Sequence, residues 1–136
     1  MPPELLREWL KHPKHRQFLL RVAVSEVEAW LLGDHEGLER FLGLRKVAAL
    51  ASPESVSDPK MELLKLASKA RSRSLRDALV WQDRHSGRLF QGPDYNGSLG
   101  AFVLRHWDLA RARRRCPSLE RLFAALRRLE KDYAAA

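Results

Sequence analysis

The chain has 136 residues, of which 45% are hydrophobic. It is therefore long enough to bury a core and too apolar for a disordered segment. No apolar run approaches the ~20 residues that a membrane span needs, and no basic-then-apolar leader opens the sequence. A single cysteine, Cys116, excludes an internal disulfide framework. We expect a cytoplasmic protein with no membrane partner.

Charge is distributed unevenly along the chain. Lys and Arg number 25 against 17 Asp and Glu, for a net charge of +8. Residues 1–58 carry 8 basic and 9 acidic side chains, whereas residues 59–136 carry 17 and 8. We expect one domain with a near-neutral strand–helix half, about 1–58, and a basic helical half, about 59–136. The basic half indicates a polyanionic partner, with nucleic acid first, although arginine-rich helix surfaces also occur without one.

Two elements are predicted before residue 25. Residues 4–11 favour a short helix that Pro13 ends. His12 and His15 flank that proline with no cysteine nearby, so exposed loop histidines are favoured over a metal pair. Residues 18–24 are apolar except for Arg21 and include two valines, which predicts a short, mostly buried strand.

Ser25 is predicted to be the corner where this strand passes into a helix. Glu26 and Glu28 lie in the first turn of that helix, where the helix dipole favours negative charge. Gly33 ends the helix. Asp34 caps a second helix, which Gly43 ends; its predicted core positions are Leu38, Phe41 and Leu42.

The middle of the chain has one clear helix start. Residues 45–50 have weak helical character, and residues 51–57 form a Ser/Pro loop. Asp58 followed by Pro59 is a typical N-cap and first helical residue, so a helix is predicted over 59–70. Its predicted buried positions are Leu63, Leu64, Ala67 and Ala70.

A basic, serine-rich junction follows. Its cations are Lys69, Arg71, Arg73 and Arg76. It is a candidate for binding phosphate oxygens, and a solvated helix end is the alternative. From Asp83 a long loop is predicted, containing Gly92-Pro93, with short extended pieces at 80–81 and 88–90.

Three helices complete the predicted architecture. The first covers 98–106, and the second begins at Asp108 and runs to Arg115, with Arg111, Arg114 and Arg115 on one face. Ser118 is predicted to cap the last, over 118–133. Its apolar stripe is expected to pack against the core, with a partner helix as the alternative; the stripe consists of Leu119, Leu122, Phe123, Leu126, Leu129 and Tyr133. The predicted class is α+β, mostly helical, with about six helices and one to three short strands.

No common catalytic motif occurs: there is no P-loop, no His-Glu-x-x-His and no Cys-x-x-Cys. What remains are acidic pairs such as Glu26 and Glu28. Residues two apart on a straight helix point about 200° apart, so these two carboxylates would share a Mg²⁺ ion only if the corner bends between them. A dipole partner and a solvent-facing carboxylate are the alternative.

Several segments together resemble a family of uncharacterised bacterial proteins, one of the domains of unknown function. They are residues 21–34 with their Glu-x-Glu-Ala-Trp-Leu-Leu run, Asp58-Pro59-Lys60, Gly92-Pro93-Asp94-Tyr95-Asn96, Phe102, Trp107 and Ser118-Leu119. The resemblance covers roughly residues 18–130. Longer members resemble toprim-type domains, including overcoming-lysogenization-defect nucleases, which hold Mg²⁺ with acidic residues. The family-motif positions to which it assigns no role are Trp30, Asp34, Asp58, Lys60 and Tyr95.

The chain departs from the longer members in one respect. Their upstream half carries an early glutamate strand and an Asp-x-Asp strand, and no Asp-x-Asp occurs here. The resemblance therefore implies the C-terminal portion of a toprim-like α/β domain, with Glu26 and Glu28 as candidate catalytic residues. Mg²⁺ is implied only if a partner supplies further acidic ligands.

Two functions follow from these observations. The first is a nucleic-acid-associated, toprim-like module, part of a metal-dependent nuclease and incomplete on its own. The residues predicted to bind phosphate are Lys69, Arg71, Arg73, Arg111, Arg113, Arg114 and Arg115. The alternative is a non-catalytic interaction or structural module that completes a partner protein or a homo-oligomer, because the predicted strand would present unpaired edges.

Overall fold

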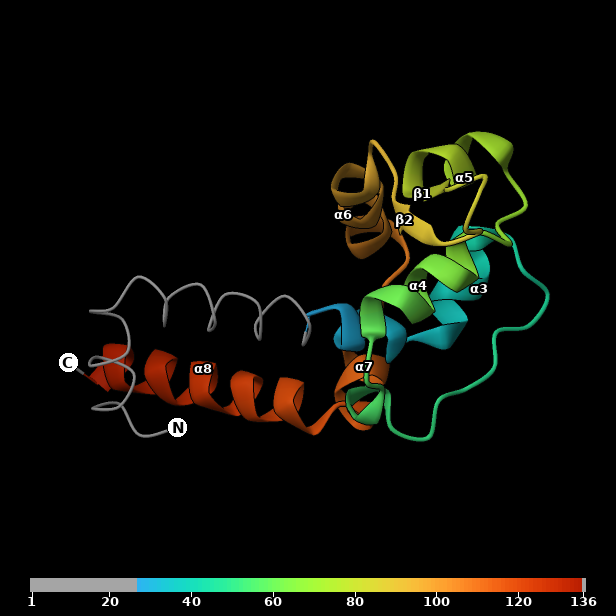
Figure 1. Cartoon of the computed structure of the whole chain (residues 1–136). Coiled ribbons are helices and arrows are strands. Elements are labelled where there is room, and N and C mark those ends of the chain that lie inside the picture. Colours follow the sequence, from blue (N-terminus) through green and yellow to red (C-terminus); the bar gives the residue numbers. More distant parts are fainter. Residues whose placement is uncertain (1–26, 136) are drawn as a thin grey trace, which may run out of the picture.

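The computed structural model describes residues 27–135, which fold into helices and one two-stranded antiparallel sheet (Figure 1). The predicted mostly helical α+β class is confirmed. The predicted helix over 4–11, the strand over 18–24 and the corner at Ser25 lie outside the described residues.

The first described elements follow the predicted caps. Residues 27–32 are helical, and α3 (His35–Leu42) follows after a break at Gly33. The Asp34 carboxylate accepts a hydrogen bond from the Gly37 amide, and Gly43 ends the helix in the left-handed region at φ 67°. Both end signals read from the sequence are therefore confirmed.

The segment after α3 is irregular, so the helical expectation for residues 45–50 is wrong. There the Val47 amide donates to the Glu39 carboxylate at 2.9 Å instead of to a helical carbonyl. A single 3₁₀ turn, η1 (Pro53–Ser55), interrupts the predicted loop. Helix α4 (Pro59–Ala67) then starts at the predicted Asp58 cap, whose carboxylate accepts from the Met61 amide.

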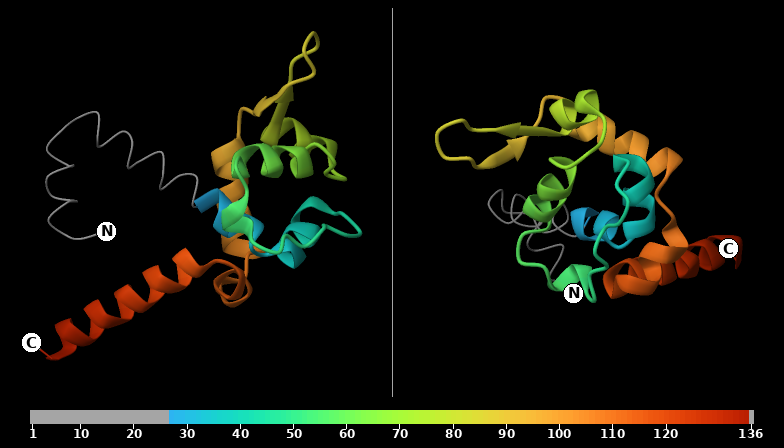
Figure 2. Two further views of the ribbon diagram at one scale, coloured as in Figure 1. Left: turned by 60° about the horizontal axis from the view of Figure 1, so that its bottom comes forward. Right: turned by 90° about the vertical axis from the view of Figure 1, so that its right-hand side faces the viewer.

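The next segment forms a helix that was not predicted and then a hairpin whose turn lies in the predicted loop. Helix α5 (Arg73–Leu79) begins at Ser72, whose hydroxyl accepts from the Leu75 amide. Strands β1 (Val80–Gln82) and β2 (Leu89–Gln91) pair in antiparallel register, as the short extended pieces indicated. The hairpin stands away from the helical body (Figure 2).

Two of the three C-terminal helices, α6 and α8, begin earlier than predicted. Helix α6 (Tyr95–Arg105) starts three residues before the predicted Ser98, and α7 (Leu109–Arg115) starts at its predicted Asp108 cap. Helix α8 (Pro117–Ala135) begins at its proline. Ser118 is therefore inside α8 and does not cap it, because proline needs no N–H partner at the first helical position.

The main core lies between α3, α4, α5, α6 and residues 27–32. Leu38, Leu63, Leu79 and Phe102 are almost completely buried there, together with the predicted Ala67 and Ala70. A second cluster joins α7 to the start of α8 through Ala112, Cys116 and Leu119, and Trp30 and Trp107 pack against it. Within residues 27–135, no helix has the length and apolar character of a membrane span.

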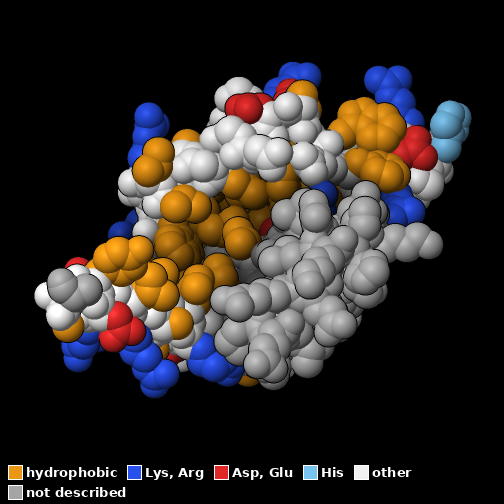
Figure 3. Space-filling model, turned by 90° about the vertical axis from the view of Figure 1, so that its left-hand side faces the viewer, with side chains coloured by type: hydrophobic (Ala, Val, Ile, Leu, Met, Phe, Trp, Pro, Cys, Tyr) orange, Lys and Arg blue, Asp and Glu red, His pale blue; other side chains and the backbone are white. Residues whose placement is uncertain are grey.

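Helix α8 extends away from this body (Figures 1 and 2). Of its predicted stripe only Leu119 is buried, whereas Leu122 is 42% exposed, Leu126 56% and Tyr133 80%. The expectation that the whole stripe packs against the core is therefore wrong. Hydrophobic side chains remain at the surface on this side of the molecule, around a hollow (Figure 3).

Candidate functional site

A buried carboxyl–phenol pair links the beginning of the described chain to α6. The Tyr95 hydroxyl donates to Glu28 Oε1 at 2.8 Å, and the two residues are only 4% and 6% exposed. Burial raises the pKa of Glu28, against the opposing effect of the Tyr95 hydrogen bond. Burial and the neighbouring carboxylate also raise the pKa of Tyr95. The pair is chemically able to hold a proton that an exposed glutamate would release.

An apolar cavity of about 370 Å³ lies beside this pair. Three of the residues that line it have polar side chains: Glu28, Tyr95 and Asn96. The other lining residues are Val27, Leu31, Leu99, Gly100 and Val103. The carboxyl of Glu28 therefore lies at an apolar hollow and does not point into bulk water.

The start of α4 brings two further candidate residues close to the pair. Lys60 Nζ lies 5.4 Å from the centre of the Tyr95 ring and donates to Gln91 Oε1 at 2.8 Å. The charge of Lys60 lowers the pKa of Glu28, and that of Asp58 raises it. Four of the sequence-predicted positions, from three separate segments, thus meet at one place.

Trp30 has a structural role in the second cluster. Its indole N–H donates to the Ser118 hydroxyl at 2.8 Å, and its carbonyl accepts from the Trp107 indole at 3.1 Å. The Ser118 hydroxyl and amide both donate to the Glu54 carboxylate, the amide at 2.9 Å. These bonds tie residues 27–32 to η1 and α8.

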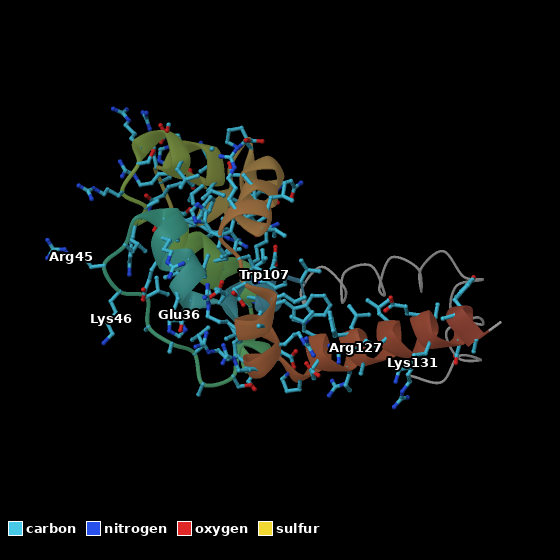
Figure 4. The ribbon with its side chains drawn as sticks, turned by 180° about the vertical axis from the view of Figure 1, so that it is seen from behind. Glu36, Arg45, Lys46, Trp107, Arg127 and Lys131 are labelled. Atoms are coloured by element: carbon cyan, nitrogen blue, oxygen red, sulfur yellow. The ribbon has the colours of Figure 1, made fainter. Side chains whose placement is uncertain are left out.

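Asp34 and Glu36 hold α7. Arg111 Nε donates to Asp34 Oδ1 at 2.6 Å, and Arg115 donates both terminal nitrogens to Glu36 at 2.9 and 3.0 Å. The Arg115 guanidinium lowers the pKa of Glu36 to about 2. Figure 4 shows Glu36 and Trp107 at this junction of α3 and α7. Two of the arginines predicted to bind phosphate are therefore engaged with carboxylates of the chain itself.

The other predicted phosphate-binding residues lie in two separate places. Arg113 forms a two-bond ion pair with Glu120 and stacks on the Phe123 ring, whereas Arg114 is exposed. Lys69 and Arg71 are exposed at the junction before α5, and Arg73 is 87% exposed, only 3.8 Å from Asp77. The structure does not gather the seven cations on one surface.

The hairpin presents aromatic side chains that the sequence reasoning did not select. Trp81 and Phe90 are directly opposite each other in the register, with ring centres 5.5 Å apart, and they are 56% and 40% exposed. The Arg88 guanidinium lies 5.2 Å from the centre of the Phe90 ring. The sequence did contain a signal for this aromatic pair: Trp81 and Phe90 each lie in a predicted extended piece, and Arg84 and Arg88 lie between them.

The hairpin loop is held by side-chain bonds. Asp83 accepts from the Ser86 amide and hydroxyl, which lowers the pKa of its carboxyl. Gly87 adopts φ 72° and its carbonyl accepts from the Gln82 side chain at 3.0 Å. The aromatic pair therefore stands on a defined turn.

Mg²⁺ does not fit the donor set of the part of the chain that the structure describes. No group of three or more His, Cys, Asp or Glu side chains comes together there. The oxygen Oε1 of Glu28 is occupied by the Tyr95 hydroxyl, and Glu26 lies outside the described residues. We derive no metal-dependent step from this arrangement.

Comparison with known proteins identifies one family. The model described as "Domain of unknown function (DUF4276)" matches residues 3–127. The chain belongs to the DUF4276 family. No curated protein and no solved structure matches it. In this DUF4276 protein, Glu28, Trp30 and Asp34 each contact a different later segment, so this short stretch organises the fold around it.

Proposed function

We propose that this DUF4276 protein is a nucleic-acid-associated module and that its β1–β2 hairpin binds single-stranded segments. The observation that carries the proposal is the exposed Trp81–Phe90 pair, with Arg88 against one of its rings. Bases stack on such aromatic faces at about 1–3 kcal/mol per base, and only unpaired bases reach them.

Basic side chains around the hairpin support the proposal. Arg84 and Arg88 are exposed on the hairpin itself, and Lys60 contacts the end of β2 through Gln91. The exposed Lys69, Arg71 and Arg73 precede α5, which leads directly into β1. These cations belong to the hairpin and to the segment that leads into it, and they would neutralise backbone phosphates.

The resemblance to toprim-type nucleases extends the proposal to a two-part enzyme. In that case the Glu28–Tyr95 pair and Lys60 would contribute one side of a site, and a partner would supply the acidic ligands for a metal. The buried Glu28–Tyr95 pair and the cavity beside it support a site at this position.

The test is fluorescence anisotropy with labelled single-stranded and duplex DNA on the full chain. We expect single strands to bind more tightly and binding to weaken steeply as salt rises. The double variant Trp81→Ala, Phe90→Ala should weaken single-strand binding about tenfold or more, because two stacking contacts are lost. Leu104→Ala, on α6, is the matched control, because Leu104 is apolar and 87% exposed.

Substitution at the separate basic surfaces locates the phosphate contacts. Arg88→Ala should reduce both affinity and salt dependence, whereas Arg114→Ala, on α7, should leave both unchanged. No binding at low salt, or equal losses in Leu104→Ala and the aromatic double variant, contradicts the proposal.

A second candidate function is an interaction module. The exposed apolar stripe of α8 is the observation that favours it, and self-association of the full chain in sedimentation velocity tests it.

A further inference from the structure

A second cavity lies between the start of α4 and strand β2, and its volume is about 370 Å³. Strand β2 packs against α4, so the two sides of the cavity are fixed relative to each other. The volume is within the range of small-molecule pockets, about 300–1,000 Å³. The cavity is therefore large enough to hold a ligand.

Charged side chains of both signs line this cavity. Asp58 contributes a carboxylate, and Lys60 and Arg88 contribute cations. Among residues 27–135, none of these three side chains forms an ion pair. The cavity therefore has hydrogen-bond donors and an acceptor that remain available to a ligand.

Two of these groups are held in place by the chain itself. Asp58 caps α4, and its Oδ1 accepts from the Met61 amide at 3.1 Å. Lys60 Nζ donates to Gln91 Oε1 at 2.8 Å and lies 5.4 Å from the centre of the Tyr95 ring. Because an ammonium group has three donors, two others remain for a ligand. Groups that are already oriented lose little freedom on binding.

The cavity also has an aromatic and apolar part. Phe90 lines it together with Leu64 and Leu89, and Phe90 is 40% exposed. Unpaired bases stack on aromatic side chains of this kind. Phe90 also belongs to the aromatic pair of the hairpin, so the cavity adjoins the surface to which the proposed function assigns a single strand.

The charges of the cavity discriminate between ligands. Asp58 would repel a phosphate, whereas Lys60 and Arg88 would repel an ammonium group. A base with donors on one edge and acceptors on another suits both signs. Unpaired guanine has N1–H and an amino group on its Watson–Crick edge, and its O6 and N7 are the acceptors that Arg and Lys bind. Cytosine and adenine offer a carboxylate only one amino group, and thymine offers none.

We propose that this cavity binds one unpaired guanine base of a single strand. Asp58 accepts from N1–H and the amino group, and Lys60 and Arg88 donate to O6 and N7. This inference rests on the proposed function and adds base selectivity to it.

Strands that differ in one base test the selectivity. A dT strand with one central dG should bind the full chain about tenfold more tightly than the all-dT strand, because a good two-bond base contact discriminates at about this level. Deoxyinosine keeps N1–H, O6 and N7 and lacks the amino group. Replacing dG by deoxyinosine should therefore remove part of the preference.

A matched pair of variants tests the carboxylate. Asparagine is as good a helix cap as aspartate, so Asp58→Asn should preserve α4. It replaces the carboxylate with an amide, and the preference for dG should fall to about twofold or less. Asp108→Asn makes the same change at the cap of α7, outside the cavity, and should keep the preference. Unfolding by urea checks that both variants remain folded.

The outcomes separate this inference from the proposed function. Equal affinity for the strands with and without dG overturns the guanine site and leaves the proposed function standing. A preference for dG that Asp58→Asn retains also overturns the guanine site. Absence of binding by both strands contradicts the proposed function, and the guanine site is overturned with it.

Discussion

Glu28 and Tyr95 are 67 positions apart in the chain, and a 2.8 Å hydrogen bond joins them in the interior. The bond crosses from the first described helical turn to the first turn of α6, and it satisfies both polar groups beside an apolar cavity. Because a buried polar group without a partner costs more than the bond itself contributes, the pair holds these two segments together.

Tyr95→Phe should therefore destabilise the protein. It leaves the Glu28 carboxyl without its buried donor, and we expect the free energy of unfolding to fall by about 1–3 kcal/mol. Urea denaturation followed by circular dichroism measures the change. Tyr133→Phe is the control, because Tyr133 is 80% exposed; its effect should be about 0.5 kcal/mol or less. Equal effects of the two variants would show that the buried bond is unimportant.

The ion pair between Glu36 and Arg115 predicts a loss of stability in acid. The pKa of Glu36 is lowered from 4.5 to about 2 in the folded protein. Its contribution is therefore present above pH 4.5 and is lost as the pH falls towards 2. Glu36 is 36% exposed, so solvent screening reduces the contribution to roughly 1 kcal/mol. Glu36→Gln should lack this part of the acid dependence in unfolding curves measured against pH.

Glu28 predicts a pH dependence of the opposite sign. Burial raises its pKa in the folded state, so the protonated carboxyl favours folding at pH values below the unfolded pKa. This contribution is lost as the pH rises through the folded pKa. Glu28→Gln should therefore gain stability relative to the wild type as the pH rises, in the same unfolding measurements. A variant that follows the wild type at every pH would contradict the assignment.

The Asp34 carboxylate accepts hydrogen bonds from three different residues. It is completely buried and accepts from two backbone amides, those of Gly37 and Asp108, as well as from Arg111. Asp34→Ala should cost about 3–5 kcal/mol, because it leaves these donors without an acceptor. Asp77→Ala is the control: its pair with Arg73 is 3.8 Å long and exposed, and such pairs contribute about 0–1 kcal/mol. Chemical denaturation of both variants makes the comparison.

Two glycine substitutions should act in opposite directions. A Cβ at Gly92 would lie 2.5 Å from the Ala78 carbonyl oxygen and 2.6 Å from the Val80 nitrogen, at the base of the hairpin. Gly92→Ala should therefore destabilise by about 1–3 kcal/mol and accelerate hydrogen exchange in β1 and β2. Gly100 lies inside α6 with nothing within 4 Å, so Gly100→Ala should stabilise by about 0.5–1 kcal/mol.

Local signals in the sequence were sufficient for most helix ends. Asp34, Gly43, Asp58 and Asp108 act where predicted, because a cap depends on a few neighbouring residues and the backbone. The partners of Glu28, Trp30 and Arg111 were not predictable in the same way. These partners lie about 67 to 88 positions away in the sequence. A local sequence pattern does not indicate which distant segment will contact a residue.

The errors have the same origin. Residues 45–50 have helical propensity, but the Val47 amide finds the Glu39 carboxylate. The periodicity of the α8 stripe predicted a helix with an apolar face, and the helix is confirmed; what that face contacts depends on where α8 points. The aromatic pair of the hairpin became visible only when the register placed Trp81 opposite Phe90.

The ion pairs that join Asp34 and Glu36 to α7 also affect the orientation of α8. Arg111 and Arg115 lie one turn apart, so together they set the rotation of a seven-residue helix about its axis. Only Cys116 separates that helix from α8. At 1.5 Å per residue, α8 is a lever arm of about 28 Å, so a small angular slip at the two arginines is amplified into a wide displacement of Tyr133 at its far end.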